Sequence, residues 1–171
     1  VERSRGLGDV YKRQIQGTEL SLSTEVTTLA GTGSAGSTNG TGTAASFNLP
    51  KGITTDGTNL YLADFSNHLI RQIVISTGVV TTLAGSGTPG SEDGTGTAAS
   101  FRSALDITTD GTNLYVADGS NNRIRQIVIS TGVVTTLAGS TTAGSTDGTG
   151  TAASFSRPWG VTTDGTNLYV A

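Results

Sequence analysis

One long motif recurs along this chain at a fixed spacing. The run Val-Thr-Thr-Leu-Ala-Gly ends at Gly31, at Gly85 and, after the same interval, at Gly139. The stretch 47–85 returns almost unchanged as 101–139 and, in shortened form, as 155–171. A unit of this length that cannot bury its apolar side chains alone must pack against copies of itself, so the spacing predicts a tandem array.

Each repeat contains four short apolar segments separated by turn residues. In the first full repeat these segments are 52–55, 60–63, 69–75 and 79–84, and the segment 26–30 matches the last of them. They are short and rich in Ile, Val, Thr and Tyr, which predicts β-strands. The only helical element we expect is a single turn at 43–47 and its copies.

The turns between these segments predict antiparallel hairpins. Asp56-Gly57 and Asp110-Gly111 are strong hairpin signals, because Gly accepts the positive φ that tight turns demand. Gly78 suits the left-handed position of the loop Ser76-Thr77-Gly78 in the same way.

The third segment is apolar on both sides. Alternation predicts that Ile73 and Ile75 point one way while Ile70 and Val74 point the other, and a strand of this kind lies in a sheet that is covered on both faces. A four-stranded meander covered by its own copies is a blade of a β-propeller. We therefore predict an all-β fold, an incomplete propeller of about three blades. Phe47, Phe101 and Phe155 are expected to fill the gaps between neighbouring blades.

The repeat divides the chain into five parts. We expect residues 1–14 to lie outside the fold, because they match nothing in the repeat and end in a sequence that resembles translated sequencing adapter. The end of a blade then occupies 15–31, full blades occupy 32–85 and 86–139, and a partial blade occupies 140–171.

Composition narrows the classes of function. Residues 1–14 hold four of the ten basic residues, so the remainder has six basic and eleven acidic residues, which disfavours nucleic acid as a partner. The chain has no Cys, which excludes disulfides and thiolate metal sites. No apolar run approaches the roughly 20 residues that span a bilayer, so no membrane insertion is expected. Abundant Gly, Ser and Thr with two Lys resemble exported bacterial proteins, and we expect an extracellular or cell-surface location.

The repeat resembles the NHL repeat family over nearly everything from residue 25 onwards. The elements that carry the resemblance are Gly52-Ile53, Asp56-Gly57, Asn59 to Asp64 and Asn67-His68-Leu69-Ile70-Arg71, with Asn121-Asn122-Arg123-Ile124-Arg125 as a variant. The resemblance implies a β-propeller, commonly six-bladed, that acts as a binding platform for protein, nucleic acid or carbohydrate; a few relatives are enzymes. Asp106 departs from the pattern, because the other repeats have Gly52 and Gly160 there.

Strand direction predicts which loops share a side of the molecule. The turns after the second strand should lie beside the long Gly-rich loops, with the Asp-Gly and Ser-Thr-Gly turns on the opposite side. Long, varied loops favour a ligand surface on the first side. The candidate binding residues there are Asp64, Phe65, Asn67, His68, Asp118, Asn121, Asn122, Arg123 and Trp159.

Several of these residues also have structural interpretations. Asp64 and Asn67, like Asp118 and Asn121, suit a turn closed by short polar side chains. Arg71 and Arg125 are expected to find an acidic or carbonyl partner, because a guanidinium between packed sheets must be paired. Trp159 either fills space at a blade junction or stands at the rim as a stacking platform.

The sequence predicts no metal site and no cofactor. His68 is the only His, and one His on an outer strand cannot form a ligand set. The loop at Asp147 supplies one carboxylate, the loop at Asp93 has Glu92 as the only extra one, and Asn39 replaces the Asp in the first copy, so each falls short of the six oxygens that Ca²⁺ prefers.

We expect a noncatalytic binding module whose loop side takes a protein or glycan ligand, and which packs against further blades of the same chain. Near-identity between repeats leaves no unique cluster of acid, base and nucleophile. The alternative is part of a propeller enzyme, of the lyase or lactonase type, with its catalytic residues in other blades. A structural spacer is a third interpretation.

Overall fold

The computed structural model describes residues 25–171, which form an all-β structure of twelve strands and five single-turn 3-10 helices. Residues 1–24 fall outside the described part, including the predicted leader 1–14 and most of the predicted blade end. Within residues 25–171, no helix has the length and apolar character needed to cross a bilayer.

The first full repeat forms a five-stranded antiparallel sheet in the order β1-β5-β4-β3-β2. The strands are β1 (Gly40–Thr41), β2 (Pro50–Thr55), β3 (Asn59–Asp64), β4 (Leu69–Val74) and β5 (Val79–Ala84). Single 3-10 turns, η1 (Gly42–Ala44) and η2 (Phe65–Asn67), follow β1 and β3.

The second repeat forms the same sheet, in the order β6-β10-β9-β8-β7. Its elements are β6 (Gly94–Thr95), η3 (Gly96–Ala98), β7 (Ala104–Thr109), β8 (Asn113–Asp118), η4 (Gly119–Asn121), β9 (Arg123–Val128) and β10 (Val133–Ala138). The third repeat contributes η5 (Gly150–Ala152) and the hairpin β11 (Val161–Thr163) and β12 (Leu168–Val170).

The turn glycines explain why the strands reverse where they do. Gly57 has a φ of +89° between β2 and β3, and Gly78 has a φ of +69° between β4 and β5. Asp56 reinforces the first turn, because its Oδ1 accepts the N–H groups of Thr58 and Asn59 at 2.8 and 2.7 Å. The predicted antiparallel hairpins are confirmed.

Two strand predictions need correction. The segment 26–30 was predicted to be a strand, but it forms none, because no strand among the described residues lies beside it to complete its hydrogen bonds. The long segment 69–75 ends as a strand at Val74, and Ile75 is exposed. The short edge strands β1 and β6, which extend each sheet beyond its fourth strand, were not predicted.

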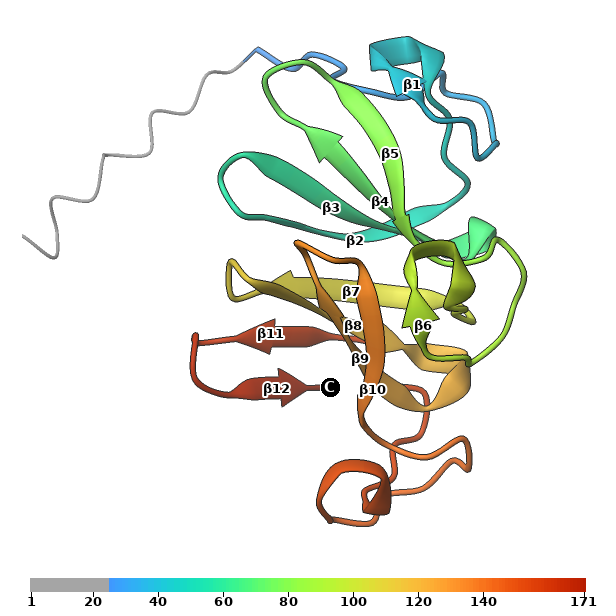
Figure 1. Ribbon diagram of the computed structural model, residues 1–171, viewed down its shortest axis with the longest axis vertical. Coiled ribbons are helices and arrows are strands. Elements are labelled where there is room, and N and C mark those ends of the chain that lie inside the picture. Colours follow the sequence, from blue (N-terminus) through green and yellow to red (C-terminus); the bar gives the residue numbers. More distant parts are fainter. Residues whose placement is uncertain (1–24) are drawn as a thin grey trace, which may run out of the picture.

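The three sheets follow one another along the length of the molecule, with β7 packed between β2 and β11 (Figure 1). Hairpin turns gather toward the left of this view, and the long loops with η2 and η4 lie toward the right. We call the second side the loop side. This division agrees with the one predicted from strand direction.

Apolar side chains fill the spaces between sheets. One buried cluster joins the first sheet to the second and includes Ile70, Phe101, Ile107 and Leu114. A smaller cluster joins the second sheet to the hairpin of β11 and β12. Ile73, on the other side of β4, is also buried. The predicted two-sided burial of this strand and the core role of Phe101 are therefore confirmed.

Candidate functional site

A buried arginine joins each long loop to its sheet. In the first repeat Arg71 of β4 donates from Nη1 to Asp64 at 2.9 Å, and both side chains are fully buried. Its Nη2 donates to the Thr38 carbonyl at 3.1 Å and to Asn39 Oδ1 at 2.8 Å. The Arg71 guanidinium is thus paired with acidic and carbonyl groups, as expected. Most of these partners belong to the long loop that precedes the sheet.

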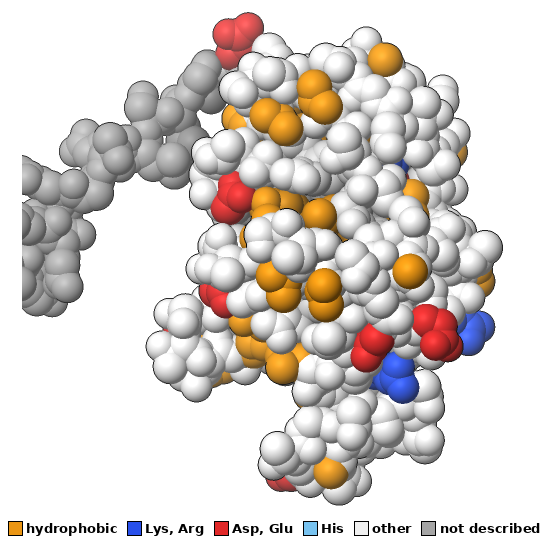
Figure 2. Space-filling view, in the orientation of Figure 1, with side chains coloured by type: hydrophobic (Ala, Val, Ile, Leu, Met, Phe, Trp, Pro, Cys, Tyr) orange, Lys and Arg blue, Asp and Glu red, His pale blue; other side chains and the backbone are white. Residues whose placement is uncertain are grey.

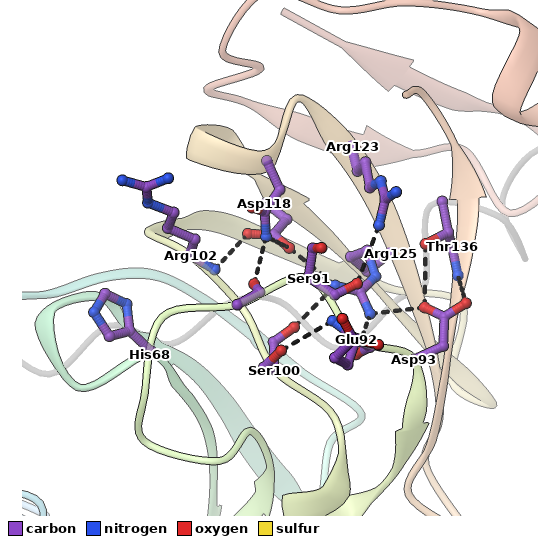
Figure 3. A network of polar contacts seen from close by, with 12 residues as sticks. His68, Ser91, Glu92, Asp93, Ser100, Arg102, Asp118, Arg123, Arg125 and Thr136 are labelled. Carbon is purple, nitrogen blue, oxygen red and sulfur yellow. Dashed lines mark hydrogen bonds and ion pairs between the residues drawn. The ribbon is translucent and has the colours of Figure 1, made fainter. Parts of the chain in front are cut away.

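The second repeat builds the same network with more charge (Figure 3). Arg125 pairs with Asp118 at 3.0 Å and with Asp93 at 2.7 Å. It also donates to the carbonyls of Ser100 and Glu92 at 3.0 and 2.9 Å. Burial raises the pKa of the Asp118 carboxyl, although hydrogen bonds from Asn121 and from the Arg102 N–H, together with Arg125, act in the opposite direction.

The asparagine of each short turn completes this network. Asn67 donates from Nδ2 to Asp64 at 2.8 Å and to the Gly36 carbonyl at 2.7 Å, and Asn121 repeats both bonds with Asp118 and Gly90. Through these contacts the turn after β3 or β8 is fixed to the long loop that precedes the sheet. The loop side is consequently held by side chains that are almost entirely inside the protein.

A second set of contacts joins one repeat to the next. His68 has a left-handed φ of +56°, and its Nδ1 accepts the Ser103 N–H at 3.4 Å. At the equivalent place Asn122 has a φ of +55°, and its Oδ1 accepts the Arg157 N–H at 2.8 Å. The sequence analysis missed this contact between repeats. The signal that could have indicated it is the alignment of His68 with Asn122, because the His ring and the Asn amide can both accept a hydrogen bond from a backbone N–H.

Burial and the nearby charge of Arg102 lower the pKa of His68, while Asp118 acts to raise it. The neutral ring has an acceptor nitrogen for the Ser103 N–H, and the hydrogen bond assigns that nitrogen as Nδ1. His68 is therefore occupied as a link between two repeats.

One five-residue segment varies between the repeats while its immediate flanks stay the same, although its first and third copies share Pro and Gly at two positions. It is 48–52, 102–106 and 156–160, each preceded by Phe and followed by Ile or Val. We call these the variable segments. They lie at the entry to β2, β7 and β11, and backbone bonds from Ser66 to Asn48 and from Ser120 to Arg102 fix the first two against the turns η2 and η4.

The first and third variable segments expose large apolar side chains, whereas Ala104 and Leu105 of the second are buried. Leu49 is 63% exposed and Trp159 is 57% exposed. The Lys51 Nζ lies 5.7 Å from the centroid of the Phe65 ring, and the Arg157 Cζ lies 5.3 Å from that of Trp159. Trp159, at the position that Leu105 occupies in the second repeat, is exposed.

The nine candidate residues divide by burial. Asp64, Asp118 and Asn121 are buried; Phe65, Asn67, His68, Asn122 and Arg123 are half-buried; and Trp159 is exposed. The structure brings the first group together with Arg71 or Arg125 in the interior. The side chains that reach the surface of the loop side are those of the second and third groups.

Among residues 25–171, no group of three or more His, Cys, Asp or Glu side chains lies close enough to hold a metal ion. The loop carboxylate of Asp93 instead accepts from Arg125 and from Thr136, and Asn39 accepts from Arg71 in the first repeat. These polar groups serve the arginine network.

The tyrosine and aspartate of each Asp-Gly hairpin form a further polar group on the opposite side. Tyr61 donates its hydroxyl to Asp56 Oδ2 at 2.8 Å, and burial together with this bond raises the Tyr61 pKa to about 12. The same pair recurs as Tyr115 with Asp110 and as Tyr169 with Asp164. Its recurrence in all three repeats marks it as part of the hairpin.

Comparison with known proteins relates this structure to solved structures. No protein-family model matches the chain, and no curated protein matches it. A structural genomics protein of unknown function from Bacteroides thetaiotaomicron is 30% identical, with a TM-score of 0.61 over 66% of this chain and 29% of that one. An auxiliary nutrient binding protein from the same organism is 23% identical, with a TM-score of 0.57 over 64% of this chain and 31% of that one.

A putative phosphatase from Bacteroides thetaiotaomicron is 21% identical, with a TM-score of 0.58 over 69% of this chain and 31% of that one. The chain therefore spans less than a third of the length of each of these three structures. Identities as low as those of the nutrient binding protein and the phosphatase relate the folds and not the activities. What the comparisons establish is a sheet-rich architecture shared with longer Bacteroides proteins.

Proposed function

We propose that this chain is part of an NHL-type β-propeller that acts as a noncatalytic binding module, with the variable segments on its loop side as the ligand surface. Two features support the propeller. Successive four-stranded meanders place β2, β7 and β11 side by side, as strands around a common axis would lie. The solved structures that match are also much longer than the part that this chain covers.

A further blade before the first sheet accounts for an open surface there. Ile107 is 2% exposed because the first sheet covers it, whereas the equivalent Ile53 is 55% exposed. A hollow of about 710 Å³ lies beside Phe47 and the loop 30–35. Gly85, which corresponds to Gly31 of that loop, packs closely against His68 and Leu69 at the end of the first full repeat. The exposed surface, which includes the apolar side chain of Ile53, is one that another copy of the repeat would cover.

The observation that carries the binding proposal is the contrast between the variable segments and their surroundings. The framework of Phe, Asp, Asn and Arg is repeated, whereas all five positions of the segment differ between 48–52 and 102–106. Arg102 is exposed although repeats lie on both sides of its segment, so packing between repeats does not account for its exposure. Variation along an exposed strip of a rigid repeat is typical of a recognition surface.

The buried networks suit such a surface. Asp64 Oδ1 accepts the Asn48 N–H at 2.8 Å, and Asp118 Oδ1 accepts the Arg102 N–H at the same distance. The first two variable segments are thereby each held at their first residue by a buried carboxylate. A segment that is ordered before binding loses less conformational entropy when a ligand arrives.

The ligand we propose is a protein or a glycan. Phe65 and Trp159, each beside a cation, offer flat apolar faces with polar rims, which suit both ligand classes. Charged side chains of both signs gather at the lower right of the molecule, toward the loop side, without forming a basic surface (Figure 2). An exported or surface-associated location, suggested by the abundance of Gly, Ser and Thr, is part of the proposal.

A binding screen with the full chain tests the proposal. Immobilised glycans and surface proteins are the probes, and Trp159→Ala is expected to weaken the complex about tenfold, the loss of one aromatic contact. Thr112→Ala is the matched control, because Thr112 is exposed in a hairpin turn on the opposite side. Equal effects of the two variants, or submicromolar binding of RNA at moderate salt, would overturn the proposal.

A further inference from the structure

A polar hollow of about 420 Å³ lies on the outer strands of the second repeat. It is lined by Ser91, Glu92, Asp93, Arg123, Thr136 and Thr151. The first three belong to the long loop before β7, Arg123 opens β9, Thr136 lies in β10, and Thr151 comes from η5 of the next repeat. Figure 3 shows Arg123 reaching toward Ser91, and Asp93 joined to Thr136. The hollow is separate from the variable segments.

Two charged groups of this hollow have unused bonding capacity. Arg123 donates from Nη1 to the Ser91 carbonyl at 3.0 Å, whereas its Nη2 forms no hydrogen bond and the side chain forms no ion pair within residues 25–171. The Glu92 carboxylate has no hydrogen bond or ion pair to the described residues, since only the backbone atoms of Glu92 are bonded.

The third charge is held in place. Asp93 accepts from Arg125 at 2.7 Å and from the N–H and the hydroxyl of Thr136 at 3.1 Å each, yet its side chain remains 49% exposed. A carboxylate oxygen has more than one acceptor position, so Asp93 can still accept a bond from a ligand. The hollow thus presents a fixed acceptor, a free acceptor and a free donor.

These three charges are not needed to fold a repeat. The first repeat has Thr38, Asn39 and Leu69 at their places, while Ser37, Thr82 and Thr97 match the three hydroxyl residues of the hollow unchanged. It nevertheless forms the same five-stranded sheet and the same arginine network, with Asn39 as a partner of Arg71. A structural requirement therefore does not account for Glu92 and Arg123.

We propose that the hollow binds a neutral saccharide, an inference that rests on the proposed binding function and names its ligand class. A carboxylate can accept two neighbouring hydroxyls, and a guanidinium can donate two parallel N–H bonds to neighbouring oxygens. The opposite charges of Glu92 and Arg123 disfavour a phosphate, which the carboxylates repel, and a metal cation, which the guanidinium repels. In an open hollow an ion pair to a zwitterion gains little, whereas several directional hydrogen bonds to one sugar ring add together.

Isothermal titration of the full chain with neutral oligosaccharides of glucose, mannose, galactose and xylose tests this inference. Arg123→Leu and Glu92→Thr install the residues of the first repeat, and each is expected to weaken binding of the selected sugar at least about tenfold. The circular dichroism spectrum should stay unchanged, because the first repeat folds with these residues. Thr112→Ala is again the control with unchanged affinity.

Placing the charged residues of the hollow in the first repeat tests the inference by a gain of binding instead of a loss. The triple variant T38E/N39D/L69R gives the first repeat all six lining residues of the hollow. It is expected to raise the number of sugars bound per chain by one. Failure of the whole panel to bind, or unchanged affinity in Arg123→Leu and Glu92→Thr, would overturn the saccharide inference. If Trp159→Ala weakens a ligand while these two variants do not, the inference fails and the proposed function stands.

Discussion

Arg71 and Asp64 form an ion pair of 2.9 Å in which both side chains are fully buried, and Arg125 and Asp118 repeat it at 3.0 Å one repeat later. The aspartate ends one strand and the arginine lies in the strand that follows, so the hairpin itself brings the two charges together. Because each arginine also bonds the loop that precedes the sheet, the pair connects distant parts of a repeat.

Removing one member of this pair is expected to destabilise the protein strongly. Arg125→Met leaves the Asp118 carboxylate buried without its cation, which costs about 3–5 kcal/mol in the free energy of unfolding. Urea denaturation followed by circular dichroism measures the loss. Arg102→Met is the control, because this side chain is exposed and its replacement costs no more than about 0.5 kcal/mol. Equal stabilities of the two variants would show that the buried pair does not hold the repeat together.

Strands β2 and β7 of neighbouring repeats approach each other closely, and this contact leads to a second prediction. A Cβ added to Gly52 would lie 2.6 Å from the Asp106 Cα and 2.9 Å from the Ile107 nitrogen, whereas at Gly160 the nearest atom would be 3.8 Å away. Gly52→Ala is therefore expected to lower the free energy of unfolding by about 1–3 kcal/mol, as overpacking does. Gly160→Ala is the matched control in the same denaturation experiment. A harmless Gly52→Ala would contradict the tight packing of β2 on β7.

The strands could be predicted because their signals are local. Runs of Ile, Val and Thr between turn glycines located β2 to β5 closely, and alternation along 69–74 indicated burial on both sides. The strand predicted at 26–30 failed because a strand needs a partner, and local sequence does not say whether a partner is present. The edge strand β1 was missed because Gly40 and Thr41 carry no apolar pattern.

The candidate site was harder to predict because its contacts are long-range. The sequence showed that Arg71 needs a partner, but not that Thr38 and Asn39, in the distant loop before the sheet, accept two of its four hydrogen bonds. The same limit applies to His68, whose partner Ser103 lies in the next repeat. Polar residues of one turn look alike in sequence, and only packing separates the buried Asp118 from the half-buried Arg123.

The aspartates of the hairpin turns make stability depend on acid pH. Burial acts to raise the pKa of Asp110, but N–H groups of Asn113 and Thr112, the Asn113 side chain and the Tyr115 hydroxyl lower it to about 2 from 3.8. Since the folded pKa is below the unfolded one, this stabilisation is complete above about pH 4 and is lost as pH falls towards 2. Solvent screening limits it to about 1 kcal/mol or less.

Asp110→Asn tests this dependence. The difference in the free energy of unfolding between the unsubstituted protein and the variant is expected to be constant from pH 7 to about pH 4 and to shrink by pH 2, as measured by urea denaturation at each pH. Asp147→Asn, in an exposed loop outside the strands, is the control. A difference that stays constant down to pH 2 would mean that the turn does not favour the charged aspartate.

His68 makes the joint between the first two repeats sensitive to pH near neutrality. Burial and the charge of Arg102 lower its pKa from 6.5, and Asp118 opposes them, so the unfolded chain takes up a proton more readily than the folded one. Stability is therefore complete above about pH 6.5 and falls as pH drops below that value. Protonation also places a hydrogen on Nδ1, which then no longer accepts the Ser103 N–H.

His68→Asn should remove this dependence of the free energy of unfolding on pH between pH 7 and 5, because Asn122 fills the equivalent position and accepts the Arg157 N–H without titrating. Parallel stability profiles of the two proteins in urea denaturation over this pH range would exclude His68 as the titrating group.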